Sequence, residues 1–294
     1  MYVVLGASGH TGHVVAKNLL AAGEKVRVVG RSADRLQTLA GEGAEIFVAD
    51  AADAAALSKA FKGAEGAYVM VPPDVTGNDY RGFQERVSNA IASAVRNAGV
   101  KNVVALSSYG ADKSSGTGPV LGLHDLEQKL NQIDGANVLH LRAGYFMENT
   151  LPQVGVIRMM GSMAGPVRAD LKLPLIATQD IGAAAADALL RREFRGKQTA
   201  ELQGHRDLDY IEIASIIGKA IGKPSLGYIQ APNEQLRGAM VQMGMSANFV
   251  ELILEMAGAL NSGHMKALEP RTAANTTPTS FETFVEEEFA PAWR

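Results

Sequence analysis

The first twelve residues of this chain constrain its fold more than any other segment. Residues 2–5 are apolar, glycines stand at positions 6, 9 and 12, and residues 11–22 repeat apolar side chains with helical spacing. A strand that leads through a glycine-rich turn into a helix is the arrangement that a dinucleotide-binding loop requires. Gly6 would allow the tight turn, Gly9 the approach of the main chain to a pyrophosphate, and Gly12 the packing of helix on strand. The spacing differs by one position from the common Gly-x-Gly-x-x-Gly pattern, and the alternative is a turn that binds nothing.

The second predicted strand, residues 25–29, indicates which dinucleotide such a loop would take. In NAD sites an Asp or Glu stands about 20 residues beyond the glycines and accepts hydrogen bonds from the ribose hydroxyls. Here the strand leads into Gly30 and Arg31, and Arg35 follows one helical turn later. Two guanidinium groups would attract a 2′-phosphate that a carboxylate would repel. The sequence therefore predicts NADP(H), the alternative being that both arginines are ordinary surface charges.

The composition is typical of a compact α/β enzyme rather than of a nucleic-acid-binding or membrane protein. The 294 residues carry a formal net charge of −3 and no cysteine, and no run is rich in Lys and Arg. Disulfides and thiolate metal sites are therefore excluded, and no nucleic-acid partner is expected. No apolar run has the length of a membrane span and no signal peptide precedes the first strand, so we expect a cytoplasmic protein.

Apolar strands alternate with helices through the first half of the chain. We predict further strands at 44–48, 66–71 and 100–106, and helices at 33–40, 53–61 (with Asp53 as N-cap) and 78–97 (ending before Gly99). Such alternation predicts a Rossmann-type doubly wound α/β fold, a parallel sheet with helices on both faces. Ligands of these sheets bind at the carboxyl ends of the strands. The loops expected to share that rim are Gly6–Gly12, Gly30–Ser32, Asp50-Ala51, Pro72-Pro73 and Ser107-Ser108.

The second half of the chain is less regular. Residues 1–150 are expected to form an NADP(H)-binding domain to which 151–200 contributes strands, and residues 151–294 a smaller, mainly helical part that binds substrate and forms a lid. The features predicted there and just before are a loop at 109–118, a helix at 119–133, a strand at 137–141, an irregular segment to 172, a helix capped by Asp180, two amphipathic helices in 232–260 joined near Ser246, and a capping box from Thr279 to Glu282.

Several motifs resemble those of the NmrA-like branch of the atypical short-chain dehydrogenases. The most specific is Leu141-Arg-Ala-Gly-Tyr-Phe-Met-Glu-Asn149, although Ala143 stands where such proteins often carry proline. The group includes NADPH-dependent quinone and azo-dye reductases and also regulators that bind the dinucleotide without turning it over. The resemblance implies that Tyr145 and Phe146 lie beside the nicotinamide and Asn149 near the substrate. Further resemblances are Gly6–Gly12, Gly30-Arg31, Ser107-Ser108, Asp180-Ile-Gly182 and Thr279–Phe284.

The predicted cofactor contacts come from the rim loops and from this motif. No metal site is expected, because no histidine has the spacing of a ligand set. The cofactor residues are Gly6, Ser8, Gly9, His10, Thr11, Gly12, Arg31, Arg35, Asp50, Pro72, Ser107 and Tyr145, and the substrate residues are Phe146 and Asn149.

Two patterns supply the catalytic candidates. Tyr109 and Lys113 have the Tyr-x-x-x-Lys spacing of short-chain dehydrogenases, but Gly110 and the Ser- and Gly-rich run that follows favour a loop, so we interpret the match as coincidental. His124 and Glu127 stand three apart on a predicted helix and could act as an acid–base pair. Such a pair is more typical of a solvated helix face. Tyr109 and His124 remain the candidates, and the proton donor is unassigned.

Two functions of different classes fit these patterns. The first is an NADPH-dependent oxidoreductase that reduces a quinone-like or other small conjugated compound, for which placement beside the nicotinamide supplies much of the acceleration. The second is a non-catalytic NADP(H)-sensing regulator, which the lack of a Tyr/Lys pair favours. A third possibility, an epimerase or dehydratase of the extended short-chain type, is disfavoured because this chain lacks the same pair. The Met-rich, apolar second half favours the reductase with a small-molecule substrate; whether the chain forms a homodimer is left open.

Overall fold

The centre of the molecule is a seven-stranded sheet in which every pairing is parallel. The computed structural model describes residues 1–294. The strand order β10-β6-β5-β4-β1-β2-β3 confirms the doubly wound α/β prediction. The strands are β1 (Tyr2–Leu5), β2 (Val26–Gly30), β3 (Glu45–Val48), β4 (Gly66–Val69), β5 (Asn102–Ser108), β6 (Asn137–Ala143) and β10 (Lys197–Leu202).

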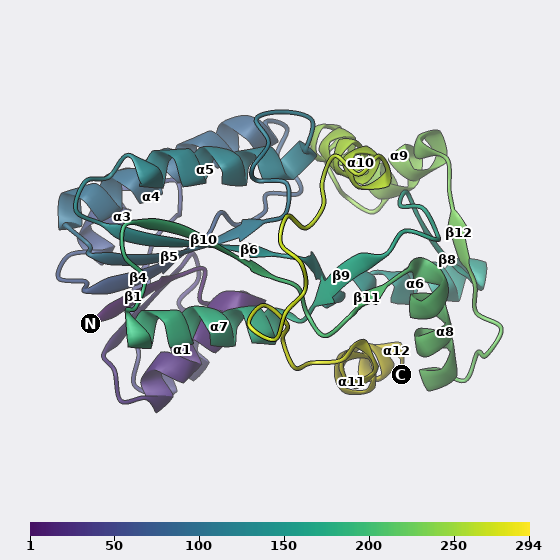
Figure 1. Ribbon diagram of the computed structural model, residues 1–294, viewed down its shortest axis with the longest axis horizontal. Coiled ribbons are helices and arrows are strands. Elements are labelled where there is room, and N and C mark those ends of the chain that lie inside the picture. The colour runs from purple at the N-terminus through teal and green to yellow at the C-terminus, as the bar shows by residue number, and fades with distance from the viewer.

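Helices cover both faces of this sheet (Figure 1). On one face lie α3 (Ala54–Ala60), α4 (Tyr80–Ala98) and α5 (Leu121–Asn131), and on the other α1 (His10–Ala21) and α7 (Thr178–Arg191). Helices α1 and α7 pack closely, because a Cβ at Gly182 would stand 2.6 Å from Cβ of Val14. The short elements of this part are a 3₁₀ turn at Asp34–Leu36 with α2 (Gln37–Gly41), and a 3₁₀ turn at Gly118–Val120.

The order of the strands reverses at β1, which pairs with β2 on one side and β4 on the other. Successive crossovers run outward in opposite directions from this point, so the loops after β1 and β4 separate and leave a crevice at the carboxyl ends of the strands. The fold thereby brings together the glycine loop and the loops after β2 and β4.

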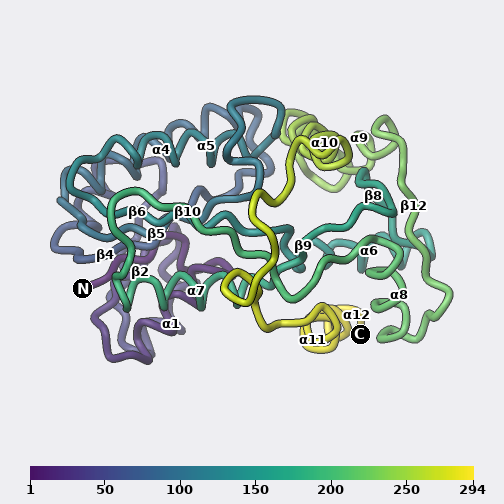
Figure 2. The backbone as a smooth tube through the Cα atoms, viewed as in Figure 1, coloured from purple at the N-terminus to yellow at the C-terminus, as the bar shows by residue number.

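The second part of the chain mixes strands and helices around its own apolar core, which includes Leu175, Ile213 and Phe289. In Figure 2 the segment between α10 and α11 runs across the middle of the molecule and links the two parts. The elements are β7 (Tyr145–Phe146), a 3₁₀ turn at Met147–Thr150, α6 (Gln153–Met160), β8 (Met163–Gly165), β9 (Leu173–Ile176), β11 (Asp207–Leu208), α8 (Tyr210–Ala220), β12 (Tyr228–Gln230), α9 (Asn233–Gln242), α10 (Ala247–Asn261), α11 (Phe281–Phe284), a π turn at Val285–Phe289 and α12 (Ala290–Trp293).

Two capping predictions are wrong. Helix α7 begins at Thr178 with Ala177 as its N-cap, so Asp180 lies inside the first turn. Its carboxylate instead accepts hydrogen bonds from the backbone N–H and hydroxyl of Thr279, at 3.0 and 2.7 Å. Thr279 is thus tied to α7, and Ser280 caps α11 by accepting from the N–H of Thr283. Both residues contact a segment about 100 positions away, which local spacing does not reveal.

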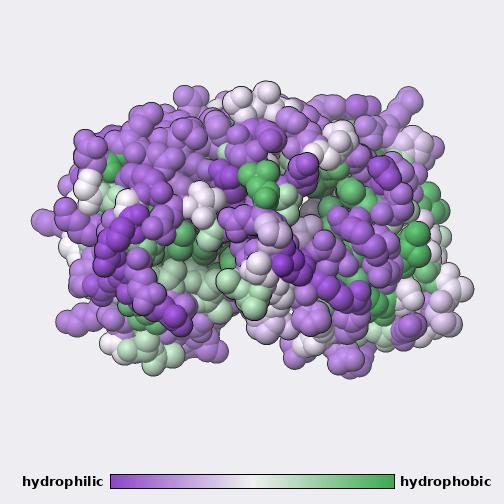
Figure 3. Space-filling view, viewed as in Figure 1, coloured by the Kyte–Doolittle hydropathy of each residue, from purple (hydrophilic) through white to green (hydrophobic).

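Another expectation fails between 142 and 172, where the segment predicted to be irregular contains β7, α6 and β8. The helix pair in 232–260 is confirmed, and Ser246 caps α10 by accepting from the N–H of Phe249. No helix combines the length and the apolar character that a bilayer crossing requires. Figure 3 shows one face of the molecule covered mainly by hydrophilic residues, with apolar residues showing near β12 and α8, where Ile229 and Ile211 are exposed.

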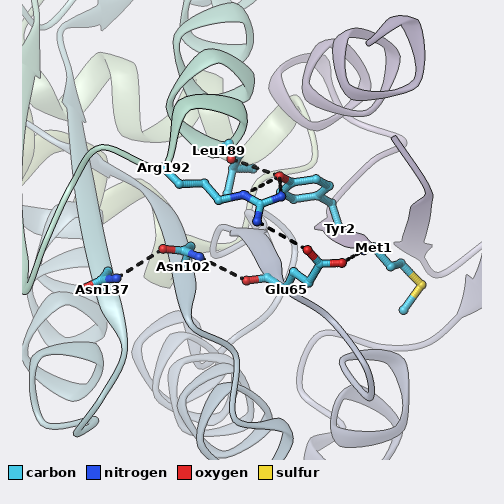
Figure 4. A network of polar contacts seen from close by, with 7 residues as sticks. All are labelled: Met1, Tyr2, Glu65, Asn102, Asn137, Leu189 and Arg192. Atoms are coloured by element: carbon cyan, nitrogen blue, oxygen red, sulfur yellow. Dashed lines mark hydrogen bonds and ion pairs between the residues drawn. The ribbon is translucent and has the colours of Figure 1, made fainter. Parts of the chain in front are cut away.

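A polar network closes the amino-terminal end of the sheet (Figure 4). The fully buried Tyr2 donates its hydroxyl proton to the carbonyl of Leu189 and accepts from two guanidinium nitrogens of Arg192, at 2.8 and 2.5 Å. Glu65 pairs with Arg192 and with the chain's amino group. Arg192 adopts a left-handed conformation, φ 52°, directly after α7. The network therefore fixes the carboxyl end of α7 to β1, at the edge of the sheet opposite the ligand-binding crevice.

Removing one hydroxyl tests this network. We expect Tyr2→Phe to lower the free energy of unfolding by about 1 to 3 kcal/mol, because a buried carbonyl and part of a guanidinium lose their partner. Arg191→Ala is the control, since its ion pair with Asp187 is exposed and should contribute no more than about 0.5 kcal/mol. Denaturant unfolding followed by circular dichroism measures both, and equal losses would contradict the role given to Tyr2.

Candidate active site

The glycine loop joins β1 to α1 with almost no free space. Gly6 has φ +71°, and a Cβ on it would stand 2.8 Å from the sulfur of Met70. A Cβ on Gly12 would stand 2.4 Å from the carbonyl oxygen of Gly6. Gly9 is the N-cap of α1 and no side chain caps that helix. The first N–H groups of α1 are therefore available to an anion, as a dinucleotide loop requires.

A cavity of 260 Å³ lies along this loop and contains both predicted arginines. The guanidinium of Arg35 donates to the carbonyl of Ser8 at 3.4 Å, and both Arg31 and Arg35 are exposed. Asp50 accepts the N–H of Ala52 at 2.8 Å, which fixes the turn after β3. The lining residues predicted from the sequence are Gly6, Ser8, Gly9, Arg31, Arg35, Asp50 and Pro72.

A second cavity, of 310 Å³, adjoins the first and shares Met70 and Pro73 with it. All of its 21 lining residues are uncharged, and 13 of them are hydrophobic. It extends from the ends of β5 and β6 to α10, which contributes Met256 and Leu260. The predicted residues that it contains are Ser107, Tyr109, Tyr145, Phe146 and Asn149. The structure thus brings the predicted substrate residues together with the end of the predicted cofactor site.

A third, more polar cavity of 480 Å³ lies against the glycine loop as well and contains His10. Glu148 stands there, and one of its oxygens accepts from the N–H and hydroxyl of Thr178 at 2.8 and 2.5 Å. Thr11 lines none of the three cavities: it is buried, and its hydroxyl accepts from Tyr68 at 2.8 Å. Any contact of Thr11 with a cofactor would therefore use its backbone N–H rather than its hydroxyl.

Beneath the 310 Å³ cavity lies a buried ion pair, Glu127 with Arg142, that the sequence did not reveal. Glu127 is only 3% exposed, so the expectation of a solvated helix face is wrong. Its carboxylate accepts two hydrogen bonds from Arg142, at 2.9 and 2.6 Å, and one from the hydroxyl of Ser107 at 2.5 Å. Ser107 and Arg142 are register partners on β5 and β6. Glu127 falls on the apolar stripe of its helix with residues 123, 126 and 130, a signal that could have indicated its burial.

Neither catalytic candidate presents a free group to the cavity. Tyr109 lines it, but its hydroxyl donates to the carbonyl of Leu202 at 3.3 Å, and burial raises its pKa. Lys113 pairs with Asp112 in the loop after β5, so Tyr109 and Lys113 do not share a helix face. A ring nitrogen of His124 lies 2.8 Å from the carbonyl oxygen of Ala111. With Glu127 bound to Arg142, His124 and Glu127 do not form the acid–base pair considered from their spacing.

Tyr145 is another polar residue of the cavity lining. Its hydroxyl lies 3.3 Å from that of Tyr210, the first residue of α8. The ring of Tyr210 stacks on Tyr228 with centroids 4.2 Å apart. Burial raises the pKa of Tyr145, and the hydrogen bond from Tyr210 acts in the opposite direction. Tyr145 is therefore a neutral hydroxyl at physiological pH.

Comparison with known proteins assigns the chain to a family. A family model described as NmrA-like matches residues 2–287. The chain belongs to the NmrA-like family. The resemblance inferred from the glycine loop and from Leu141–Asn149 is thus confirmed.

Two curated relatives of this NmrA-like protein are reductases. One is (4-alkanoyl-5-oxo-2,5-dihydrofuran-3-yl)methyl phosphate reductase of Streptomyces griseus, 30% identical over 227 residues, which are 76% of this chain and 75% of the relative. The other is quinone oxidoreductase 2 of Escherichia coli, 27% identical over 269 residues, 90% of this chain and 89% of the relative. The chain is therefore similar in sequence to oxidoreductases.

Two solved structures show how far the fold extends. The NADPH-dependent quinone oxidoreductase of Escherichia coli in complex with NADPH superposes with a TM-score of 0.80 at 24% identity, over 97% of this chain and 98% of the other. NmrA, a negative transcriptional regulator solved in complex with NADP, superposes with a TM-score of 0.67 at 17% identity, over 98% of this chain and 95% of the other. The whole chain therefore has a fold found both in a reductase and in a regulator.

The closeness of α1 to the loop predicts a large effect of one methyl group. Gly12→Ala should lower the free energy of unfolding by about 1 to 3 kcal/mol, because its Cβ would overlap the carbonyl of Gly6 and push the helix off the loop. Gly155→Ala is the matched control, because nothing lies within 4 Å of its Cβ position in α6, and the added helix propensity should stabilise by about 0.5 to 1 kcal/mol. Thermal and denaturant unfolding measure both variants. An unchanged free energy of unfolding in Gly12→Ala would mean that the close approach of α1 to the loop is not needed.

Proposed function

We propose that this protein is an NADPH-dependent reductase of small, neutral, conjugated carbonyl compounds such as quinones. The observation that carries the proposal is the pairing of two adjoining cavities of opposite character. One contains two arginines, and the other is lined by uncharged residues alone. An anionic cofactor that extends from the first into the second would bring its reactive end beside an apolar substrate.

The residues of the first cavity fit NADPH. The glycine loop leaves no room for a Cβ at Gly12, and the uncapped start of α1 suits a pyrophosphate. Arg31 and Arg35 supply planar donors suited to a 2′-phosphate. Bound there, NADPH supplies the hydride for the reduction. The solved relatives with NADPH or NADP bound support this choice of cofactor.

The second cavity determines what such a reductase could accept. Phe146, Leu123, Met256 and similar side chains would exclude water and hold a flat ring, while Ser107 is held in place by Glu127. Because no cation lines the cavity, a sulfonate, carboxylate or phosphate on the substrate would lose its hydration without gaining a partner. The name of the Streptomyces relative specifies a phosphate ester. The uncharged lining favours a neutral substrate here. For the substrate class, the quinone oxidoreductase of Escherichia coli is therefore a better model than the Streptomyces enzyme.

A matched pair of quinones tests the proposal. We expect multiple turnovers of NADPH with menadione, measured as the loss of NADPH absorbance, and a kcat/KM at least ~10-fold lower with the sulfonate of the same ring system. Equal rates would contradict the neutral-substrate assignment. Tight NADPH binding with no oxidation by any quinone would contradict the reductase and favour a regulator of the NmrA type.

The cofactor preference depends on charge at one position. Arg31→Asp should weaken NADPH binding by about 10- to 100-fold, because a charge-assisted hydrogen bond is replaced by repulsion of the 2′-phosphate. NADH lacks that phosphate, so its affinity should change little. Calorimetric titration with both dinucleotides measures the difference, and an equal loss for both would show that Arg31 does not select the phosphate.

A further inference from the structure

The hydroxyl groups around the 310 Å³ cavity differ in where their protons can go. The proton of Ser107 is directed at the carboxylate of Glu127, and that of Tyr109 at the carbonyl of Leu202. Each hydroxyl has a single proton to donate. Ser107 and Tyr109 can therefore offer only lone pairs to a ligand, and neither can protonate it in this arrangement.

Tyr145 has the opposite polarity. Tyr210 is 7% exposed, and Tyr145 is the only hydrogen-bond partner of its hydroxyl. A buried O–H is rarely left without an acceptor. Tyr210 therefore donates to Tyr145, whose oxygen acts as the acceptor. The O–H of Tyr145 then has no partner within the protein, and Tyr145 lines the cavity.

We propose that Tyr145 is the proton donor to the carbonyl oxygen of the substrate and that Tyr210 positions it. This inference rests on the reductase function proposed above. It assigns a chemical role to a residue that the family resemblance places only beside the nicotinamide. Tyr145 is the catalytic residue in this scheme because it touches the substrate, whereas Tyr210 acts through Tyr145.

The step balances with groups already named. A hydride adds to an electrophilic position of the conjugated system, and the displaced π electrons move onto the carbonyl oxygen. An O–H bond forms between that oxygen and the proton of Tyr145, as the O–H bond of Tyr145 breaks. The tyrosinate accepts a hydrogen bond from Tyr210 and regains a proton from water. In total the substrate gains two electrons and two protons: the hydride of NADPH, the reductant, carries both electrons and one proton, and Tyr145 supplies the other proton.

Tyr210 also controls the acidity of Tyr145. Its donated hydrogen bond lowers the pKa of Tyr145, against the larger effect of burial, which raises it. The titratable groups facing this pair are Tyr228, which stacks on Tyr210, and the cavity tyrosines Tyr80 and Tyr109; all lining residues of the cavity are uncharged. An acid must be protonated to act, so activity should be present at neutral pH and fall as Tyr145 ionises at alkaline pH.

Tyr80 is the competing tyrosine in the same cavity; the hydroxyl of Ser108, which also lines it, is aliphatic and a weaker acid than a phenol. It is the first residue of α4, and its ring packs against Phe249 of α10 with centroids 4.8 Å apart. Burial and the charge of Asp74 raise the pKa of Tyr80 to about 12. No tyrosine donates to its hydroxyl to stabilise the tyrosinate. Tyr145 has such a donor in Tyr210, so Tyr80 is the alternative that must be tested beside it.

The test compares four Tyr→Phe variants, at positions 145, 210, 80 and 2, with menadione and with a neutral enone under saturating NADPH. Tyr145→Phe should reduce kcat by about 100-fold or more with NADPH affinity unchanged. Tyr210→Phe should reduce kcat by about 10-fold and move the alkaline limb of the kcat–pH profile to higher pH, because Tyr145 loses a hydrogen bond that favours its ionised form. Tyr2→Phe is the control, since its hydroxyl belongs to the polar network at the amino-terminal end of the sheet, away from the cavity, and it should leave kcat and the pH profile unchanged.

Each result has one meaning. A lower kcat in Tyr145→Phe, together with an alkaline limb shifted to higher pH in Tyr210→Phe, supports the proposal. Full kcat in Tyr145→Phe overturns it while leaving the reductase function intact, and so does a loss found in Tyr80→Phe instead. An unchanged alkaline limb in Tyr210→Phe overturns the positioning role. If the unaltered protein oxidises no NADPH with either substrate, both the function and this inference fall.

Discussion

The contact between the start of α1 and the glycine loop is the constraint on which the rest of the site depends. With a hydrogen atom as the only side chain at position 12, the helix can approach the carbonyl of Gly6 to a distance that any Cβ would prevent. This approach directs the uncapped N–H groups of α1 toward the crevice where the strand order reverses. Gly182 extends the same principle on the far side of α1, because it lets α7 pack against Thr11 and Val14.

Charge is divided along the crevice that results. The arginines follow β2, on one side of the switch point, and the uncharged cavity lies over β5 and β6, on the other. The ion pair of Glu127 with Arg142 beneath the uncharged cavity is buried and closed on itself, so it holds Ser107 without placing a net charge beside a ligand. A buried pair of this kind contributes little net stability but fixes geometry, since removing one partner would leave an uncompensated charge.

Local patterns predicted the parts of this architecture that depend on neighbouring residues. The strands and helices of the first half, the cap at Asp53 and the left-handed Gly99 after α4 all follow from short-range spacing, and all are confirmed. Local spacing predicts the wrong role for Asp180 and Thr279, because each is the hydrogen-bond partner of the other across 99 positions. The burial of Glu127 does not follow from its helix alone, because its partners come from β5 and β6 and a carboxylate without known partners is expected on a helix surface.

The polar partners and the lining of the substrate cavity could not be predicted from the sequence. Tyr145 stood in a recognisable motif, but the hydroxyl that faces it comes from α8, 65 residues later. The lining of the 310 Å³ cavity likewise combines the segment after β4 with β5, β7 and α10, which no local pattern groups together. Fold and cofactor loop are encoded locally, whereas the polarity of the substrate cavity emerges only from packing between the two parts of the chain.

A crystal structure of this protein with NADP⁺ bound tests the arrangement most directly. We expect the 2′-phosphate between Arg31 and Arg35, the pyrophosphate at the start of α1, and the nicotinamide beside Tyr145 and Phe146 at the mouth of the uncharged cavity. A nicotinamide that lies outside this cavity, or a dinucleotide bound away from the glycine loop, would contradict the reading of the two cavities as one site.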